Sequence, residues 1–208
     1  MKKNYHYDET DSTNNEAKRL IGVARSCADS CGSECVRRLY GAVVTARKQS
    51  AGRGRLGKSF ESPGGDSVYA TFIFEPPEDP ADQRITVFAA VAVCRALEQT
   101  TTYRPSIKGI NDILIEGKKV CGILAESVPG AAILGIGVNI NLSEEDFSEE
   151  LREIAGSLSM DGETRERFFE TLKDEVFRCM AIAVQPDAPE ASALAAEYHK
   201  KSSPIALR

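Results

Sequence analysis

The segment 47–60, RKQSAGRGRLGKSF, constrains the fold and the function of this chain more than any other stretch. It contains five cations, three glycines and no acid, and it directly follows the apolar, β-branched run 42–46. Glycine lets the backbone turn and approach a ligand closely, and arginine presents a planar fork of donors that matches carboxylate and phosphate groups. The pattern predicts a flexible cationic loop that leaves a buried strand and covers a small anionic ligand. The alternative is a solvated surface loop.

The rest of the chain is acidic, so this loop stands out against its background. The net charge is −5 over 208 residues, whereas a surface that binds the nucleic-acid backbone is basic. We therefore expect no nucleic-acid partner. No apolar run reaches the length of a membrane span, and the first residues lack the apolar stretch of a signal peptide. These features predict a cytoplasmic protein that does not enter a membrane.

The cysteines are expected to be free thiols, as is usual in a reducing cytoplasm. Of the six, Cys27, Cys31 and Cys35 recur every four residues. This spacing matches neither CxxC nor the usual zinc patterns. We interpret them as incidental small apolar residues, and a metal or cluster site is the alternative.

Alternating strand and helix patterns predict one α+β domain over residues 1–208, with a mixed β-sheet flanked by helices. Strands are expected at 4–8, 40–47, 67–75, 105–108, 113–116, 120–127 and 131–140. Helices are expected at 14–25, 84–101, 163–184 and 188–201. Asp11 and Ser12 are helix-capping residues before the first of these helices. Gly117 and Lys118 indicate a hairpin turn.

The cationic loop also contains a literal dinucleotide-binding fingerprint, formed by Gly52, Gly54 and Gly57. That fingerprint must open a helix whose N-terminus meets the pyrophosphate of the cofactor. The residues that follow, 58–65 (KSFESPGG), cannot form an amphipathic helix. The context therefore argues against a Rossmann domain, and the absence of GxxxxGK[ST] leaves a P-loop without support.

Four separated segments together resemble the catalytic domain of biotin protein ligases. They are DSTN at 11–14, QSAGRGRLGKSF at 49–60 leading to SPGG at 62–65, IKGIND at 107–112 with GKKVCGILAE at 117–126, and GIGVNIN at 135–141. The resemblance implies the mixed α+β fold of biotin–lipoate ligase and class II aminoacyl-tRNA synthetase-like domains. It also implies an enzyme that uses ATP and Mg²⁺ to convert biotin to biotinyl-5′-AMP, and then transfers biotin to a lysine of a biotin carboxyl carrier protein.

The same resemblance implies roles for the matching residues. The implied biotin-binding residues are Ser12, Thr13, Asn14, Gln49, Gly52, Arg53, Gly54, Arg55 and Lys108. The implied nucleotide-binding residues are Arg53, Arg55, Lys108, Asn111 and Asn139. Lys108, Arg53 and Arg55 would be catalytic, and Asp112 would help to organise Mg²⁺.

The chemistry of adenylate formation supports these roles independently. Attack of a carboxylate on the α-phosphorus brings two anions together and builds charge on the phosphoryl oxygens, which fixed cations stabilise. A glycine-rich lid would shield the reactive anhydride from water. Structural alternatives stay open. Ser12 and Thr13 could only cap the helix, and Lys108 could be a solvated strand end. Gln49 could be a surface residue, Asn111 and Asp112 a plain turn, and Gly135 and Gly137 a site of close strand packing.

The chain departs from the family pattern in places. Family members usually carry Lys-Trp-Pro-Asn-Asp where this chain has Lys-Gly-Ile-Asn-Asp at 108–112, and the chain contains no tryptophan. The missing ring removes buried surface beside the site, and Gly109 adds backbone freedom. This loss keeps a non-catalytic biotin-binding protein as an alternative. A lipoate or octanoate ligase or transferase, which shares the fold in this superfamily, is a second alternative, and the Gly-Arg-Gly-Arg loop argues against it.

The position of the motifs and the family resemblance lead to three further expectations. Because the first motif begins at Asp11, we expect no N-terminal DNA-binding module. We expect the small C-terminal barrel of the family to be missing, or reduced to a remnant at 203–208. A homodimer is expected by analogy with the family.

Overall fold

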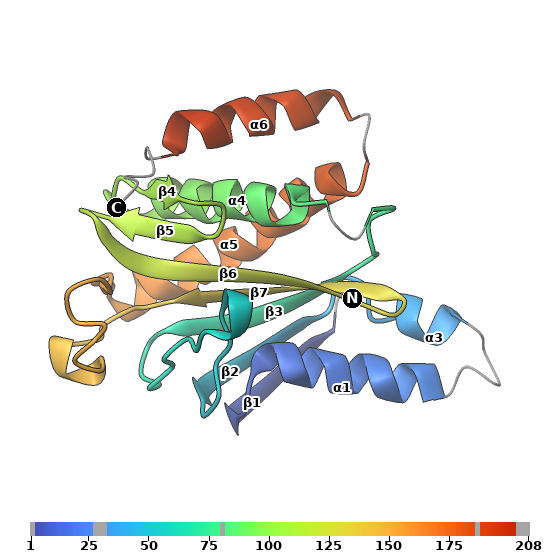
Figure 1. The fold of residues 1–208 in the computed structure, drawn as a ribbon, viewed down its shortest axis with the longest axis horizontal. Helices are drawn as coiled ribbons and strands as arrows, with labels where there is room; N and C mark the ends of the chain where they lie inside the picture. The colour runs from blue at the N-terminus through green and yellow to red at the C-terminus, as the bar shows by residue number, and fades with distance from the viewer. Residues whose placement is uncertain (1–2, 27–32, 80–81, 186–187, 203–208) are drawn as a thin grey trace.

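A mixed sheet forms the centre of the molecule (Figure 1). The computed structural model describes residues 3–26, 33–79, 82–185 and 188–202, and within them seven strands pair in the order β1-β2-β3-β7-β6-β5-β4. β1 runs parallel to β2, and every other neighbouring pair is antiparallel. The strands are β1 (Asn4–Thr10), β2 (Val43–Gln49), β3 (Val68–Phe74), β4 (Ser106–Lys108), β5 (Asp112–Ile115), β6 (Lys118–Val128) and β7 (Ala131–Val138).

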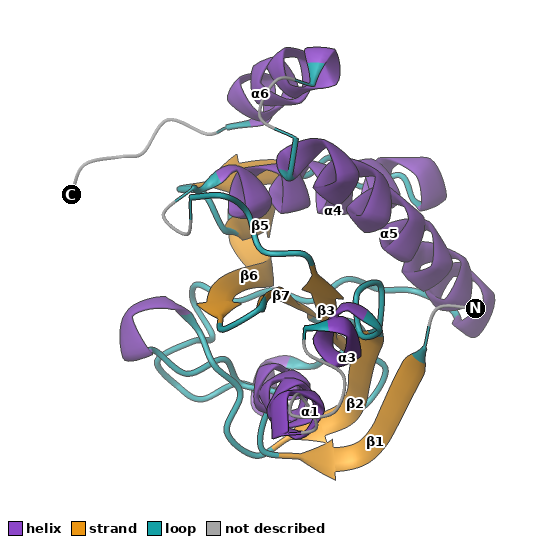
Figure 2. Ribbon diagram, turned by 90° about the vertical axis from the view of Figure 1, so that its right-hand side faces the viewer, coloured by secondary structure: helices purple, strands orange, loops and turns teal. Residues whose placement is uncertain are grey.

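Helices cover both faces of this sheet (Figures 1 and 2). On one face lie α4 (Arg84–Thr100), α5 (Gly162–Ala183) and α6 (Pro189–Lys201). On the other lie α1 (Thr13–Ser26) and the short α3 (Glu34–Arg37). The first face holds the larger core, which includes the fully buried rings of Phe72, Phe88 and Phe168. The second core is smaller, and α1 contributes Ala17 and Ile21 to it. The α1 face therefore has room for a ligand site.

The expected α+β class and mixed sheet are confirmed, and each expected strand and helix lies within three residues of its predicted bounds. The predicted hairpin joins β5 to β6, but its turn lies one residue earlier than predicted, because Lys118 already belongs to β6 and pairs with Ile115. Glu116 and Gly117 between them have φ values of 51° and 84°. Positive φ at both central residues is what a two-residue type I′ turn requires.

Among the described residues, three short elements were not predicted: α3 and the single 3₁₀ turns Arg55–Gly57 and Glu144–Asp146. Each is too short to carry a periodic pattern of its own. The Arg55–Gly57 turn lies inside the cationic loop, where Leu56 has a φ of 56° and its side chain is 95% exposed. The described part of the chain contains no helix that combines the length and apolarity needed to cross a membrane.

The prediction of free thiols is wrong at Cys35, which is disulfide-bonded. Whether two thiols can join depends on the distance between their backbones in the fold, which sequence spacing does not give. Cys94, Cys121 and Cys179 are buried free thiols. Cys27, Cys31 and the expected barrel remnant at 203–208 lie outside the described residues.

Candidate active site

A cavity of about 530 Å³ opens on the α1 face of the sheet, beside the first residues of α1. Gly135 and Gly137 form part of its floor. They lie on the same face of β7 as Ile133, which packs against α1, because side chains alternate along a strand. The cationic loop forms one wall of the cavity, and residues of the segment 142–158 form another. The cavity therefore joins segments that are far apart in the sequence.

Glycines on the floor make room for an aromatic ring. Gly122 and Gly137 are paired across β6 and β7. A Cβ atom at Gly137 would lie 2.6 Å from Phe60 Cε1, and one at Gly122 would lie 2.9 Å from Phe60 Cε2. The Phe60 ring in turn meets Tyr69 edge to face, with 6.4 Å between the ring centroids. Close packing is thus the structural reason for glycine at position 137, and the result is an apolar floor.

Asn14 joins α1 to the sheet at the third floor glycine. A Cβ atom at Gly135 would overlap Asn14 Oδ1. Thr71 donates its hydroxyl to that oxygen at 2.6 Å, and Asn14 Nδ2 donates to Glu126 Oε2 at 2.8 Å. Because both ends of this buried amide are bonded inside the protein, Asn14 holds the first turn of α1 in place.

Gln49 ties the same turn of α1 to the end of β2. Its Oε1 accepts hydrogen bonds from the Thr13 backbone N–H at 2.8 Å and from the Thr13 hydroxyl at 3.1 Å. Its Nε2 donates to Ser62 Oγ at 2.8 Å. The same NH₂ group carries a second N–H that can donate another hydrogen bond. Ser12, 2% exposed, also lines the cavity. The recess beside α1 is thus polar but uncharged, and Gln49 is not the surface residue of the alternative interpretation.

Cations from the 50–58 loop and from the end of β4 also line the cavity. Arg53 NH2 lies 3.9 Å from Glu126 Oε1, and Arg55 NH1 donates to Asn111 Oδ1 at 3.3 Å. Lys108 is exposed at the end of β4. Among the described residues, no carboxylate lies within ion-pair distance of Arg55 or Lys108. Positive charge with so little compensation attracts an anion.

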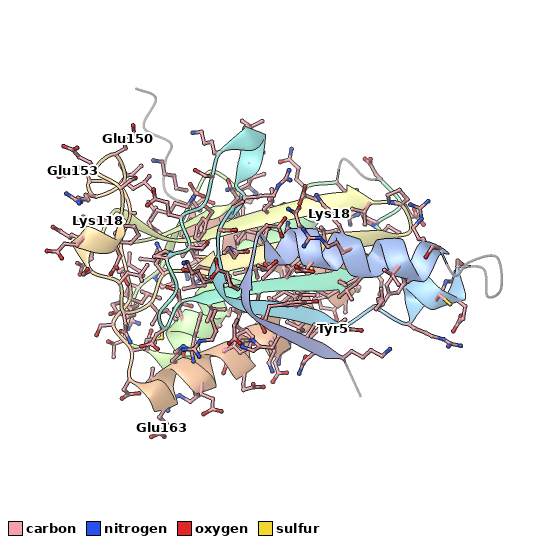
Figure 3. All side chains as sticks on the ribbon, turned by 90° about the horizontal axis from the view of Figure 1, so that it is seen from below. Tyr5, Lys18, Lys118, Glu150, Glu153 and Glu163 are labelled. Atoms are coloured by element: carbon pink, nitrogen blue, oxygen red, sulfur yellow. The ribbon has the colours of Figure 1, made fainter. Side chains whose placement is uncertain are left out.

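Glu126 is the acid that faces Arg53, and it is ionised. Burial raises its pKa, but hydrogen bonds from Lys18 and Asn14, together with the positive charges of Lys18 and Arg53, outweigh burial and lower the pKa below its usual value. Lys18, labelled on α1 in Figure 3, lies 2.8 Å from Glu126 Oε1. Glu126 therefore holds Arg53 only weakly, since its closer partners are Lys18 and Asn14.

Asn139, which follows β7, presents an unused acceptor. It is 4% exposed, and its Nδ2 donates to the Gly156 carbonyl at 3.0 Å. Its Oδ1 is buried without a partner among the described residues. A buried acceptor left unpaired costs about 1–3 kcal/mol. Because Asn139 lines the cavity, this oxygen suits a ligand that carries an N–H or O–H group.

Asp112 is suited to assist a metal ion that arrives with phosphates. Its Oδ1 accepts from Lys119 at 2.8 Å and from Asn111 Nδ2 at 3.0 Å. The described residues contain no cluster of three metal-ligating side chains. Mg²⁺ commonly binds through one or two carboxylates together with substrate phosphates and water. The donor set therefore fits Mg²⁺ carried by a nucleotide, but not a metal bound by the protein alone.

The wall formed by the segment 142–158 was not predicted. Phe147, Leu151 and Ile154 face the cavity from a stretch that is otherwise rich in acids. Ile154 is held beside β6 because its carbonyl accepts from the Lys119 backbone N–H at 2.8 Å. Figure 3 shows Glu150 and Glu153 at this end of the molecule. The segment matches no motif, and the only sequence feature that could have indicated a cavity wall is the recurrence of apolar residues among the acids.

Eleven of the twelve predicted site residues line this one cavity. They are Ser12, Thr13, Asn14, Gln49, Arg53, Gly54, Arg55, Lys108, Asn111, Asp112 and Asn139. Gly52 is not among the lining residues; it is buried under the loop, where a Cβ atom would overlap the Phe60 carbonyl oxygen. The cavity also has contributors that were not assigned to it from the sequence: Phe60, Tyr69, Lys119, Gly122, Gly135 and Gly137. The fold and the site together define an α+β ligand-binding domain whose cavity is lined by uncharged polar groups beside α1 and by cations from the 50–58 loop and β4.

Comparison with known proteins identifies the family. The sequence model of the biotin/lipoate A/B protein ligase family matches residues 40–143, half of the chain. The chain therefore belongs to the biotin/lipoate A/B protein ligase family.

Two relatives and one solved structure show how far the similarity extends. The chain is 42% identical over 126 residues to the bifunctional ligase/repressor BirA of Bacillus subtilis, covering 57% of this chain and 38% of that protein. It is 36% identical over 141 residues to the biotin–[acetyl-CoA-carboxylase] ligase of Paracoccus denitrificans, covering 64% of this chain and 52% of that protein. The biotin protein ligase from Aquifex aeolicus, solved with biotin and ATP, superposes with a TM-score of 0.75 at 24% identity, over 97% of this chain and 79% of that one. At that identity the last comparison supports the fold alone.

Proposed function

We propose that this domain activates biotin with ATP to biotinyl-5′-AMP and transfers the biotinyl group to a lysine of a biotin carboxyl carrier protein. The observation that carries the proposal is the convergence of Arg53, Arg55 and Lys108, from two separate segments, on one cavity with an uncharged polar recess. Of the two curated relatives cited here, one is named as a bifunctional ligase/repressor and the other as a biotin–[acetyl-CoA-carboxylase] ligase, and the aligned region spans 38% and 52% of their lengths.

The recess beside α1 suits the head of biotin. A neutral, polar ring system needs hydrogen-bond partners without net charge, and the amide of Gln49 and the hydroxyls of Ser12 and Thr13 supply them. The apolar floor at Phe60 suits the hydrocarbon part of the ligand. Asn14 supports this end indirectly, since its own hydrogen bonds fix the first turn of α1.

The cationic end suits the reacting groups. A carboxylate oxygen of biotin attacks the α-phosphorus of ATP, a new O–P bond forms, and the bond to the leaving pyrophosphate breaks. Negative charge builds on the α-phosphoryl oxygens, and Lys108, Arg53 and Arg55 are placed to stabilise it. Asn111 and Asn139 would contact the nucleotide, and Asp112 would assist the Mg²⁺ that accompanies ATP as part of the substrate.

The second step needs no nucleophile from this chain. The amine of the acceptor lysine attacks the carbonyl carbon of the mixed anhydride, and AMP leaves with the electrons of the C–O bond. Until the carrier arrives, water has to be kept away from the anhydride, and the 50–58 loop with Gly52 and Gly54 would serve as the cover. We place this reaction in the cytoplasm, which suits the free thiols of Cys94, Cys121 and Cys179, whereas the disulfide-bonded Cys35 is an exception to that pattern.

The proposal is tested by measuring pyrophosphate release with ATP and Mg²⁺ in the presence of biotin, lipoate or octanoate, followed by labelling of a purified carrier domain. We expect release that depends on biotin and is not supported by the other two acids. Release with lipoate or octanoate instead of biotin would replace the proposal with the related ligase activity. Calorimetric binding of biotin without any adenylate would identify a non-catalytic binding protein.

The lid function predicts a change in protease sensitivity. Arg53, Arg55 and Leu56 are exposed, and the loop contacts the rest of the fold through few polar bonds. We expect trypsin to cleave after Arg53 or Arg55, and we expect cleavage to slow about tenfold or more when biotin and MgATP order the loop. Mass spectrometry of the fragments over time measures this rate. Equal cleavage with and without the ligands would remove the lid function.

A further inference from the structure

The turn that follows Lys108 begins with a glycine, which is conformationally flexible. Lys108 pairs with Asp112 across the β4–β5 hairpin, and residues 109–111 form the turn between them. Gly109 has a φ of 62°, and a Cβ atom there would meet nothing within 4 Å. Glycine can leave such a conformation easily because it has no steric preference for either sign of φ. Some other contact must therefore keep this turn in one conformation.

That contact comes from α6, at the far end of the chain. The Tyr198 hydroxyl donates to the Gly109 carbonyl at 2.6 Å. Ser202, just after α6, forms an isolated β-bridge with Ile107, one residue before Lys108. Figure 1 shows α6 lying on the same side of the sheet as α4, next to β4. The end of α6 therefore holds the backbone on both sides of Lys108.

The helix itself is fixed by contacts that do not involve the turn. Arg95 of α4 lies 2.6 Å from Glu197 Oε2, and Lys201 lies 2.5 Å from Glu98 Oε1. Leu194 is 2% exposed within the core beneath α6. Removal of the Tyr198 hydroxyl would thus leave the helix in place and free only the turn.

We propose that Tyr198 is a positioning residue for Lys108. The hydroxyl holds the peptide group that follows Gly109, so the Gly109 backbone keeps one conformation. The end of β4 then keeps its direction, and the Lys108 ammonium group extends toward the same part of the cavity. This inference rests on the proposed adenylation, in which Lys108 stabilises charge on the α-phosphate. It also assigns to α6, which carries none of the predicted site residues, a part in the reaction.

The test is the Tyr198→Phe variant, which removes one oxygen and keeps the ring. We expect kcat for biotin-dependent pyrophosphate release to fall about fivefold, the rate equivalent of one typical hydrogen bond. We expect KM for biotin to change less than twofold, because the charge that Lys108 stabilises develops only in the transition state. The melting temperature should stay within a few degrees of that of the unchanged protein.

Two further variants separate positioning from general loosening of α6. Glu197→Gln, at the neighbouring position of the same helix, weakens the contact with Arg95 and should lower the melting temperature while kcat stays within twofold. In a Lys108→Ala background, Tyr198→Phe should lower kcat no further, since the residue that it positions is absent. An active wild-type protein with unchanged kcat in Tyr198→Phe would overturn this inference alone, as would a fivefold loss that persists without Lys108. A wild-type protein with no biotin-dependent reaction would overturn the proposed function and this inference with it.

Discussion

Replacing Lys108 with alanine is expected to lower kcat for biotin-dependent pyrophosphate release by about 10²–10³, the usual effect of removing one preorganised donor that faces developing charge. Lys108 lines the cavity from the end of β4, and no carboxylate among the described residues lies within ion-pair distance of it. Its charge is therefore available to the substrate. The neighbouring Lys119 cannot replace it readily, because Lys119 is already paired with Asp112 at 2.8 Å.

Two further variants test whether the loss of activity comes from the charge and position of Lys108. Lys108→Arg keeps the charge but spreads it over a planar group with different reach, so we expect an intermediate loss. Lys200→Ala removes an exposed lysine of α6 that does not line the cavity, and it should leave kcat unchanged. Steady-state kinetics with a coupled pyrophosphate assay measures all three variants. If Lys108→Ala kept more than a tenth of the activity, Lys108 would be the solvated strand end of the alternative interpretation.

The order and bounds of the strands and of the four long helices were accessible from the sequence because each of them carries its own pattern. β3 is continuously buried and reads as one apolar run, and the Glu116–Gly117 turn is preceded and followed by strand residues. The register of the sheet was not accessible, and neither was the position of β7 between β3 and β6. These features depend on pairing between distant segments, which local patterns do not determine.

In the site, too, residues of one contiguous motif could be predicted from the sequence, whereas contacts between distant segments could not. Arg53 and Gln49 were found because they belong to a motif that is contiguous in sequence. The role of Gly135 remained ambiguous until the structure placed it under Asn14, a residue more than a hundred positions away. The link between Tyr198 and Gly109 had no sequence signal at all, because one hydroxyl and one backbone carbonyl make no pattern.

Gly135→Ala is expected to destabilise the protein by roughly 3 kcal/mol and to weaken biotin binding by at least about tenfold. The added methyl group would overlap Asn14 Oδ1, which is buried and bonded to Thr71, while Asn14 Nδ2 is bonded to Glu126. If Asn14 moves aside, two buried hydrogen bonds are lost at about 1–3 kcal/mol each. The first turn of α1 moves with it, and that turn carries Ser12 and Thr13 into the recess.

The measurements are thermal unfolding and calorimetric titration with biotin. For a chain of this size the expected loss corresponds to a fall of about 6–12 °C in the melting temperature. Gly22→Ala is the matched control, because a Cβ atom at Gly22, in the exposed part of α1, would meet nothing within 4 Å. That change should instead stabilise the protein by about 0.5–1 kcal/mol. If the damage at position 135 acts through Asn14, then Gly135→Ala combined with Asn14→Ala should be no worse than Asn14→Ala alone. Additive losses in the double variant would mean that the methyl group disturbs β7 itself, and that the link from the sheet to α1 is not what shapes the recess.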